Sequence, residues 1–164
     1  MSIKQYYYLI VLTALFFTGC SDPESSAIDL DLGEAILTID NTVYIAEAIL
    51  GTRTIAETEY EQISLDVGDS IEIDILSVSF EEGFILWDGD TFVAKGTRFY
   101  FTSRLHGGGG FGPTSGYLII NEKTDNTISG KFEMDLYNYA SSCYDCFGNE
   151  VTVEGEFIAL RNNE

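Results

Sequence analysis

The chain from residue 34 onward is a succession of short runs in which apolar and polar residues alternate. The clearest runs span 128–136 and 151–159, where apolar residues or glycine take every second position. A period of two is that of a half-buried β-strand, because successive side chains point to opposite faces of a sheet. A slip of one residue would turn either apolar set toward solvent, so the pattern also specifies the register of these strands.

Turn residues separate the runs along the chain. Asn41-Thr42 and Gly68-Asp69 each lie between two alternating runs and predict β-hairpins. Asp88-Gly89-Asp90 predicts a further hairpin turn, with a contribution to a calcium site as the alternative. The polar stretch from Gly51 to Glu61 shows no sustained alternation and is expected to form a loop or a short helix.

Together the runs predict an all-β domain over residues 34–164, with no helix after the N-terminal segment. Strands of this kind bury their apolar faces in a single antiparallel β-sandwich or flattened barrel, here of about ten strands. The chain of 164 residues is long enough for one domain with a substantial core.

The first 20 residues follow a different pattern. Lys4 precedes a mostly apolar run of about 12 residues, Tyr6 to Phe17, whereas a membrane-spanning helix needs about 20. A charged start, a short apolar segment and small residues at its end are typical of a secretory signal. Phe17-Thr18-Gly19-Cys20 resembles the lipobox of bacterial lipoproteins, with Phe17 where that family prefers Leu. The resemblance implies cleavage before Cys20 and acylation of this residue; an ordinary signal peptide or an uncleaved anchor is the alternative.

We therefore divide the chain into a signal peptide (1–19), a lipidated tether (20–33) and the β-rich domain (34–164). The tether is mostly polar and could reach on the order of 40 Å when extended. Asp22 and Glu24 resemble the surface-export signal of Bacteroidota lipoproteins, although an acidic spacer would look the same. The expected location is the bacterial outer membrane or cell surface, with the lipid anchor in the membrane.

The formal net charge of −19 narrows the choice of partner. Such a surface repels phosphate backbones, so a nucleic acid is not expected as a ligand. The acidity fits either cation binding or simple solubility.

Cys143 and Cys146 follow the 128–136 run and precede the 151–159 run. If Cys20 is acylated, they are the two remaining thiols, and in an oxidising envelope compartment we expect them to form a disulfide. Free or redox-active thiols are the alternative, but a thioredoxin-like site needs a βαβ context that the sequence lacks. A zinc site would need about four ligands, and His106 is the only histidine.

Aromatic residues offer a candidate binding surface. Trp87, Tyr137, Tyr139 and Tyr144 could form a stacking platform for sugar rings. Core packing or cross-strand pairing is the commoner role of aromatic residues in strands.

No catalytic constellation stands out. His106-Gly107-Gly108-Gly109 resembles the oxyanion loop of esterases, but the G-x-S-x-G elbow that this chemistry requires is missing. Many carboxylates are present, and no spacing distinguishes one pair among them. We therefore assign no catalytic residue, no metal ligand and no cofactor.

Three runs carry a further resemblance: Gly116–Ile120, Asp125–Phe132 and Val151–Phe157. Their pattern is a strand, a polar turn, I-x-G-x-F, a loop and V-T-x-x-G-x-F. It resembles the C-terminal signature of a family of small β-rich lipoproteins of Bacteroidota, and the hairpin at 39–46 resembles the start of that family. These motifs are structural, so the resemblance implies a fold and an anchor but no activity.

The sequence thus predicts a lipid-anchored envelope protein that acts as a noncatalytic binding or assembly module, with a glycan or an envelope protein as partner. A glycan-binding surface lipoprotein and an envelope hydrolase that uses carboxylates are the alternatives.

Overall fold

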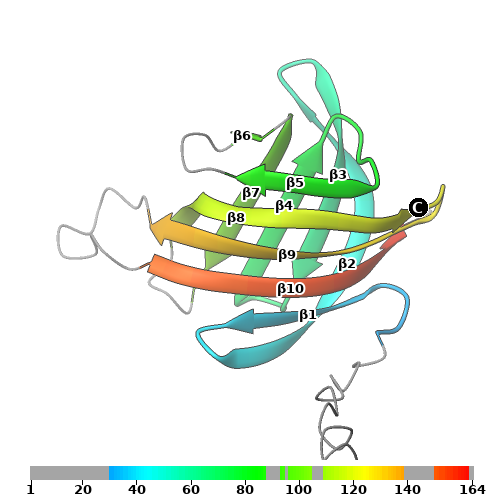
Figure 1. Cartoon of the computed structure of the whole chain (residues 1–164). Coiled ribbons are helices and arrows are strands. Elements are labelled where there is room, and N and C mark those ends of the chain that lie inside the picture. Colours follow the sequence, from blue (N-terminus) through cyan, green and yellow to red (C-terminus); the bar gives the residue numbers. More distant parts are fainter. Residues whose placement is uncertain (1–29, 88–92, 95, 105–108, 139–149, 163–164) are drawn as a thin grey trace, which may run out of the picture.

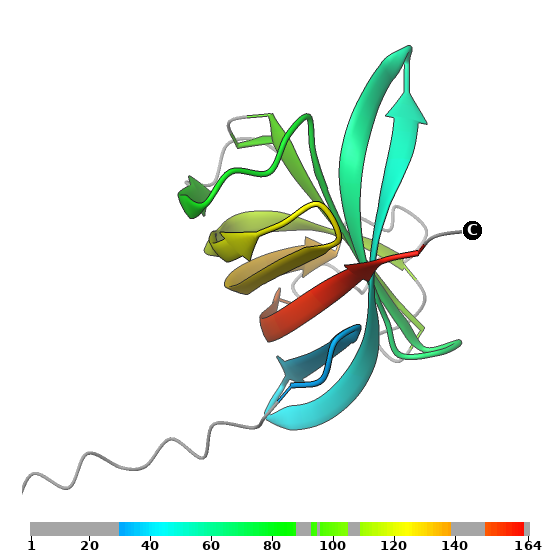
Figure 2. The same ribbon diagram turned by 90° about the vertical axis from the view of Figure 1, so that its right-hand side faces the viewer.

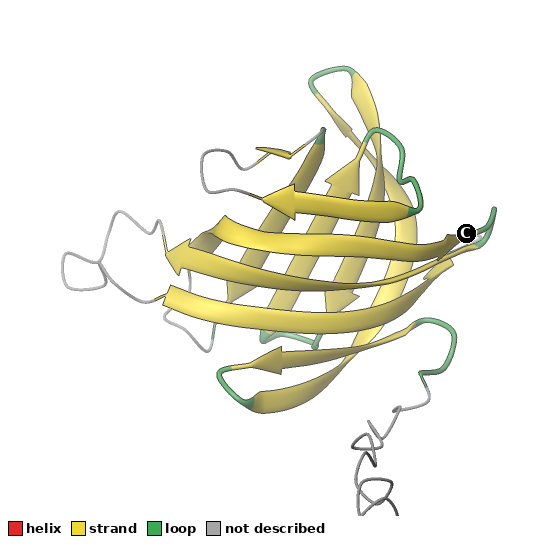
Figure 3. Ribbon diagram, in the orientation of Figure 1, coloured by secondary structure: helices red, strands yellow, loops and turns green. Residues whose placement is uncertain are grey.

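The computed structural model describes residues 30–87, 93–94, 96–104, 109–138 and 150–162. Every regular segment within these ranges is a β-strand (Figure 3). The strands are β1 (Glu34–Ile39), β2 (Thr42–Ile55), β3 (Thr58–Asp66), β4 (Ile71–Ser77), β5 (Gly83–Trp87), β6 (Val93–Ala94), β7 (Thr97–Ser103), β8 (Gly109–Lys123), β9 (Thr127–Asn138) and β10 (Glu150–Arg161). The described part of the chain contains no helix long and apolar enough to cross a membrane.

Eight of these strands form a closed barrel in the order β8-β9-β10-β1-β2-β3-β4-β7 (Figure 1). Antiparallel pairing of β7 with β8, from Phe101 opposite Phe111 to Ser103 opposite Gly109, closes the ring. β5 is an extra strand that pairs with β8, and the two-residue β6 pairs with β7. The all-β prediction is confirmed, whereas the sandwich alternative and the count of about ten strands are not, because closure uses eight strands.

The hairpins test the turn predictions. The Asn41-Thr42 signal is confirmed: β1 and β2 join through Asp40 and Asn41, whose positive φ angles of 48° and 63° suit a tight hairpin turn. The prediction for Gly51–Glu61 was wrong, because β2 runs on to Ile55 and β3 starts at Thr58. The resulting β2–β3 hairpin extends beyond the rest of the barrel (Figure 2). Only the parts of the two strands near the tip were missed, because they have solvent on both faces there, which removes the apolar alternation.

The barrel interior is filled by apolar side chains from all eight ring strands. Two glycines make room for its largest rings: Gly155 lies opposite Phe132, and Gly130 lies opposite Phe157, across the β9–β10 pair. A Cβ on Gly155 would collide with the Phe132 ring, and a Cβ on Gly130 would lie 2.8 Å from the Phe157 ring. The I-x-G-x-F and V-T-x-x-G-x-F motifs therefore interlock, since each supplies the glycine that faces the other's phenylalanine.

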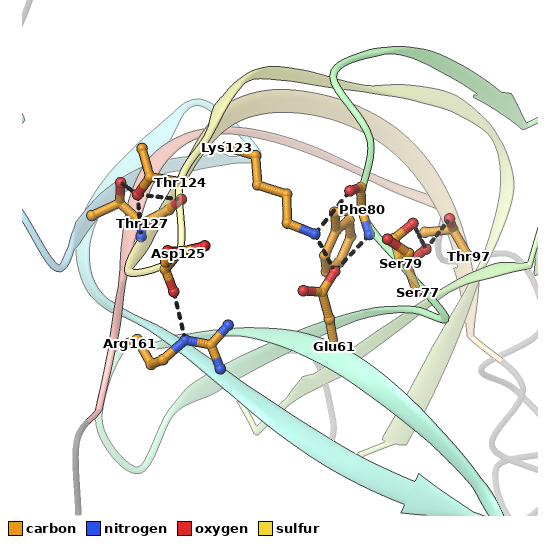
Figure 4. Close-up of polar contacts among 10 residues, drawn as sticks. All are labelled: Glu61, Ser77, Ser79, Phe80, Thr97, Lys123, Thr124, Asp125, Thr127 and Arg161. Atoms are coloured by element: carbon orange, nitrogen blue, oxygen red, sulfur yellow. Dashed lines mark hydrogen bonds and ion pairs between the residues drawn. The ribbon is translucent and has the colours of Figure 1, made fainter.

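A loop between β4 and β5 covers one end of the barrel with Phe80, whose side chain is buried. Charged side chains hold the backbone of this residue (Figure 4). Its N–H donates to Glu61 Oε2 at 2.7 Å, and its carbonyl accepts from Lys123 Nζ at 3.0 Å. Lys123 Nζ also contacts Glu61 Oε2 at 2.7 Å. These contacts join β3, the loop and β8. The ion pair therefore has a structural role: it holds the loop that covers this end of the barrel.

Candidate functional site

Most residues that the sequence singled out lie outside the described ranges. Cys20, Cys143, Cys146, Tyr139 and Tyr144 belong to this group. The lipid attachment, the disulfide and the part of the stacking platform that these residues would supply stay predictions.

The structure places the other two aromatic candidates in different surroundings. Trp87, at the end of β5, is only 2% exposed and belongs to the hydrophobic core. Tyr137 belongs to the outward-facing, partly exposed set of β9. The two rings therefore do not share a surface, and the buried Trp87 has no open ring face for a sugar.

A polar network on the outer face of the barrel is centred on Asp74 of β4. This carboxylate belongs to the outward-facing set of its strand but is only 7% exposed. Its Oδ1 accepts from Ser64 Oγ at 2.6 Å and from Gln62 Nε2 at 2.7 Å, both on β3. Its Oδ2 accepts from Arg53 Nη1 of β2 at 3.1 Å. Asp74 thus ties three neighbouring strands together, with both oxygens satisfied.

A hollow of about 470 Å³ opens over this network. Tyr100 of β7 lies opposite Asp74 in the sheet register, and Thr102 lies opposite Glu72. Tyr100 is 38% exposed, so part of its ring is accessible from the hollow. The full lining is Arg53, Ile55, Glu72, Asp74, Tyr100 and Thr102.

Arg98 belongs to the same outward-facing set of β7 as Tyr100. Its guanidinium lies 5.1 Å from the centre of the Tyr60 ring on β3, which is a cation–π contact. A side-chain hydrogen bond to Tyr100 raises the pKa of Arg98 above its ordinary value, while burial acts in the opposite direction. Arg98 therefore lies between the Tyr60 ring and Tyr100 at the border of the hollow.

A second hollow, of about 270 Å³, adjoins the first and shares Glu72 and Thr102 with it. It is also lined by Asp69 in the β3–β4 turn and by Arg104, which follows β7. We call the two hollows together the β4 furrow. Its residues are Arg53, Ile55, Asp66, Gly68, Asp69, Ser70, Ile71, Glu72, Asp74, Tyr100, Thr102 and Arg104.

The furrow concentrates cationic donors on an acidic protein. Arg53, Arg98 and Arg104, in or beside it, are three of the six basic residues in the described ranges. The lining also contains the carboxylates of Asp66, Asp69, Glu72 and Asp74. The furrow therefore presents donors and acceptors side by side.

The opposite wall of the barrel has a column of acidic residues on its outer face. Glu133 of β9 lies between Tyr117 of β8 and Glu154 of β10 in the register. Burial raises the pKa of Tyr117, and the neighbouring charges of Glu133 and Glu154 raise it further. Within the described ranges, no group of three or more His, Cys, Asp or Glu residues is arranged to hold a metal ion.

Sequence reasoning missed the furrow residues. Ile71 to Ile75 alternates perfectly, which marks Glu72 and Asp74 as solvent-facing and gives no sign that Asp74 is enclosed. Tyr100 lies on the outward face of β7, but the predicted stacking platform consists of other aromatic residues. The burial of Asp74 depends on Gln62 and Ser64, which come from another strand and carry no local signal.

Comparison with protein-family models, with curated proteins and with solved structures finds no match for this chain, so the resemblance to small β-rich lipoproteins of Bacteroidota stays a prediction.

Proposed function

We propose that the protein is a lipid-anchored, noncatalytic binding module of the bacterial envelope, and that its ligand is a glycan held in the β4 furrow. One observation supports this most directly: two adjoining hollows on an outer face contain a partly exposed aromatic ring and charged groups of both signs. The barrel interior, in contrast, is filled by core side chains over the described strands.

The chemistry of the furrow fits a ligand that is rich in hydroxyl groups. Glu72 can accept hydrogen bonds, Arg53 has further donors beyond the nitrogen that contacts Asp74, and Thr102 can do both. The Tyr100 ring offers an apolar face beside these groups. Because donors and acceptors are mixed, a neutral polyol can pair with both without bringing a charge of its own.

The alternative of a carboxylate hydrolase is less well supported by the same residues. Glu72 and Asp74 are two positions apart on one strand, so their Cα atoms are about 7 Å apart, which suits a catalytic pair. Both oxygens of Asp74, however, already accept hydrogen bonds from Ser64, Gln62 and Arg53. This carboxylate is therefore engaged in holding strands together, and we assign it a structural role.

The proposed anchor suits such a module. The lipobox-like Phe17-Thr18-Gly19-Cys20 would fix the chain to a membrane, and the tether of residues 20–33 would keep the barrel within reach of surface glycans.

A glycan array probed with the purified full chain tests this function. We expect binding to at least one neutral oligosaccharide, and Tyr100→Ala should weaken it at least about tenfold, which corresponds to about 1.4 kcal/mol. Tyr117→Ala, which removes an outward aromatic from the far wall, is the matched control and should bind as the wild type does. Equal binding by the Tyr100→Ala variant would refute the furrow as the site, and hydrolysis of a bound oligosaccharide would favour the enzyme alternative.

A further inference from the structure

Among the strands in the described ranges, β5 is the one of more than two residues that lies outside the closed ring. Along the described residues it pairs with β8 only, from Gly83 opposite Ile120 to Trp87 opposite Gly116 (Figure 1). β6 approaches β5 without pairing with it. Every second residue of β5 therefore directs its N–H and C=O away from β8, which leaves an edge that can accept another strand.

An apolar stripe runs along the outer face beside this edge. Phe84 and Leu86 are 54% and 57% exposed and lie two positions apart on one face of the strand, so together they form an exposed apolar patch. Phe84 stacks on Tyr117 of β8 with ring centres 5.7 Å apart, so the stripe has a fixed shape. Ile119 lies opposite Phe84 and completes the patch. We call these four residues the β5 stripe.

The combination of an open backbone edge with an apolar stripe selects the kind of partner. Only an extended peptide satisfies the free N–H and C=O groups, and its alternate side chains would fall on the same face as Phe84 and Leu86. A helix or a lipid could cover the stripe but would leave the backbone groups of the edge unpaired.

The charged residues around the β5 stripe indicate the charge of the partner. The exposed Glu81 and Glu82 precede the strand, and Glu133 lies opposite Tyr117 at the other border of the stripe. Lys131, opposite Ile119, faces Glu156 on its other side. With a net charge of −19, two copies of this chain would repel one another at this edge. A cationic partner is favoured instead.

We propose that β5 is a docking edge for an extended segment of a partner protein, which adds as a strand and carries apolar residues at alternate positions between basic flanks. This surface is separate from the β4 furrow, so it does not depend on glycan binding.

Fluorescence anisotropy with the full chain in lipid nanodiscs tests the edge. The probe is a labelled peptide, Lys-Lys-Val-Thr-Val-Thr-Val-Lys-Lys. We expect saturable binding below about 1 mM that weakens as salt rises. Replacing Phe84→Lys and Leu86→Lys together should weaken binding at least about tenfold. The matched control is Val43→Lys with Ile45→Lys, because these two residues on β2 are equally exposed, at 59% each.

A second peptide separates strand addition from simple apolar adhesion. It has the same side chains but N-methyl groups on all central amides, so it cannot donate hydrogen bonds to the edge. We expect it not to bind. The proposal is overturned if the first peptide does not bind, if both peptides bind alike, or if the β2 control loses as much affinity as the β5 variant. Sedimentation that shows a dimer of the wild type, dissolved by Leu86→Lys, would likewise overturn it in favour of a second copy.

Discussion

The β8–β9–β10 wall and the β2–β3–β4 face belong to one barrel but are held together by different means. In the wall, phenylalanine rings fit over glycines on the opposite strand, and every second residue faces the core. On the β2–β3–β4 face, a buried carboxylate binds donors from two neighbouring strands on the outside of the barrel. The wall is specified by local pattern, whereas the polar network exists only once the strands have paired.

The largest effect is expected from the wall. Phe132→Ala should lower the free energy of unfolding by about 3–5 kcal/mol, because it removes a buried ring and leaves a cavity opposite Gly155. Urea denaturation followed by circular dichroism measures this change. A loss under about 1.5 kcal/mol would mean that the surrounding rings collapse into the space, and that the glycine–phenylalanine fit contributes little.

A smaller effect should follow from breaking the polar network. Asp74→Ala leaves Ser64, Gln62 and Arg53 without their common acceptor, and should cost about 1–3 kcal/mol of unfolding free energy.

Asp135 provides the matched control for that variant. It also accepts two hydroxyl hydrogen bonds, from Ser115 at 2.6 Å and Thr152 at 2.9 Å, but it is exposed on the outer face of β9. Water can replace it there, so Asp135→Ala should cost about 0.5 kcal/mol or less. Equal losses in the two variants would show that enclosure does not distinguish these carboxylates.

The same contrast explains what the sequence could predict. The period-two runs at 128–136 and 151–159 predicted β9 and β10 and the faces that they bury, because burial of one face requires an apolar residue or glycine at every second position. The pairing of β7 with β8, which closes the barrel, could not be predicted, because no sequence pattern in either strand indicates its partner. Tyr100 and Asp74 are neighbours through a different long-range pairing, that of β4 with β7, so the furrow could not be predicted from local pattern either.

The closed end of the barrel combines features of the wall and of the polar network, because it has both a buried ring and an ion pair. Lys123→Met keeps most of the side-chain volume but removes the charge that contacts Glu61 Oε2 and the carbonyl of Phe80. Because both side chains are partly exposed, the expected loss of stability is about 1 kcal/mol. Hydrogen exchange at the Phe80 amide, which should quicken in this variant, locates the effect. Unchanged exchange there would show that the loop is held by the Phe80 ring alone.

The smallest effect is expected from a substitution in the turn of the β2–β3 hairpin, whose sequence lacks the residues that favour a tight turn. Ala56 and Glu57 connect the strands with φ angles of 48° and 70°, a left-handed conformation that costs energy in residues other than glycine and asparagine. Asn-Gly is the preferred pair for such a turn. The double substitution Ala56→Asn, Glu57→Gly should therefore stabilise the hairpin by about 0.5–1 kcal/mol, with the tip contacts otherwise unchanged. Because the hairpin extends beyond the barrel, amide exchange at Ile55 and Thr58, which face each other next to the turn, should slow, while the wall strands remain as protected as before. Unchanged or faster exchange at the tip would show that the left-handed conformation of Ala56 and Glu57 does not strain the turn.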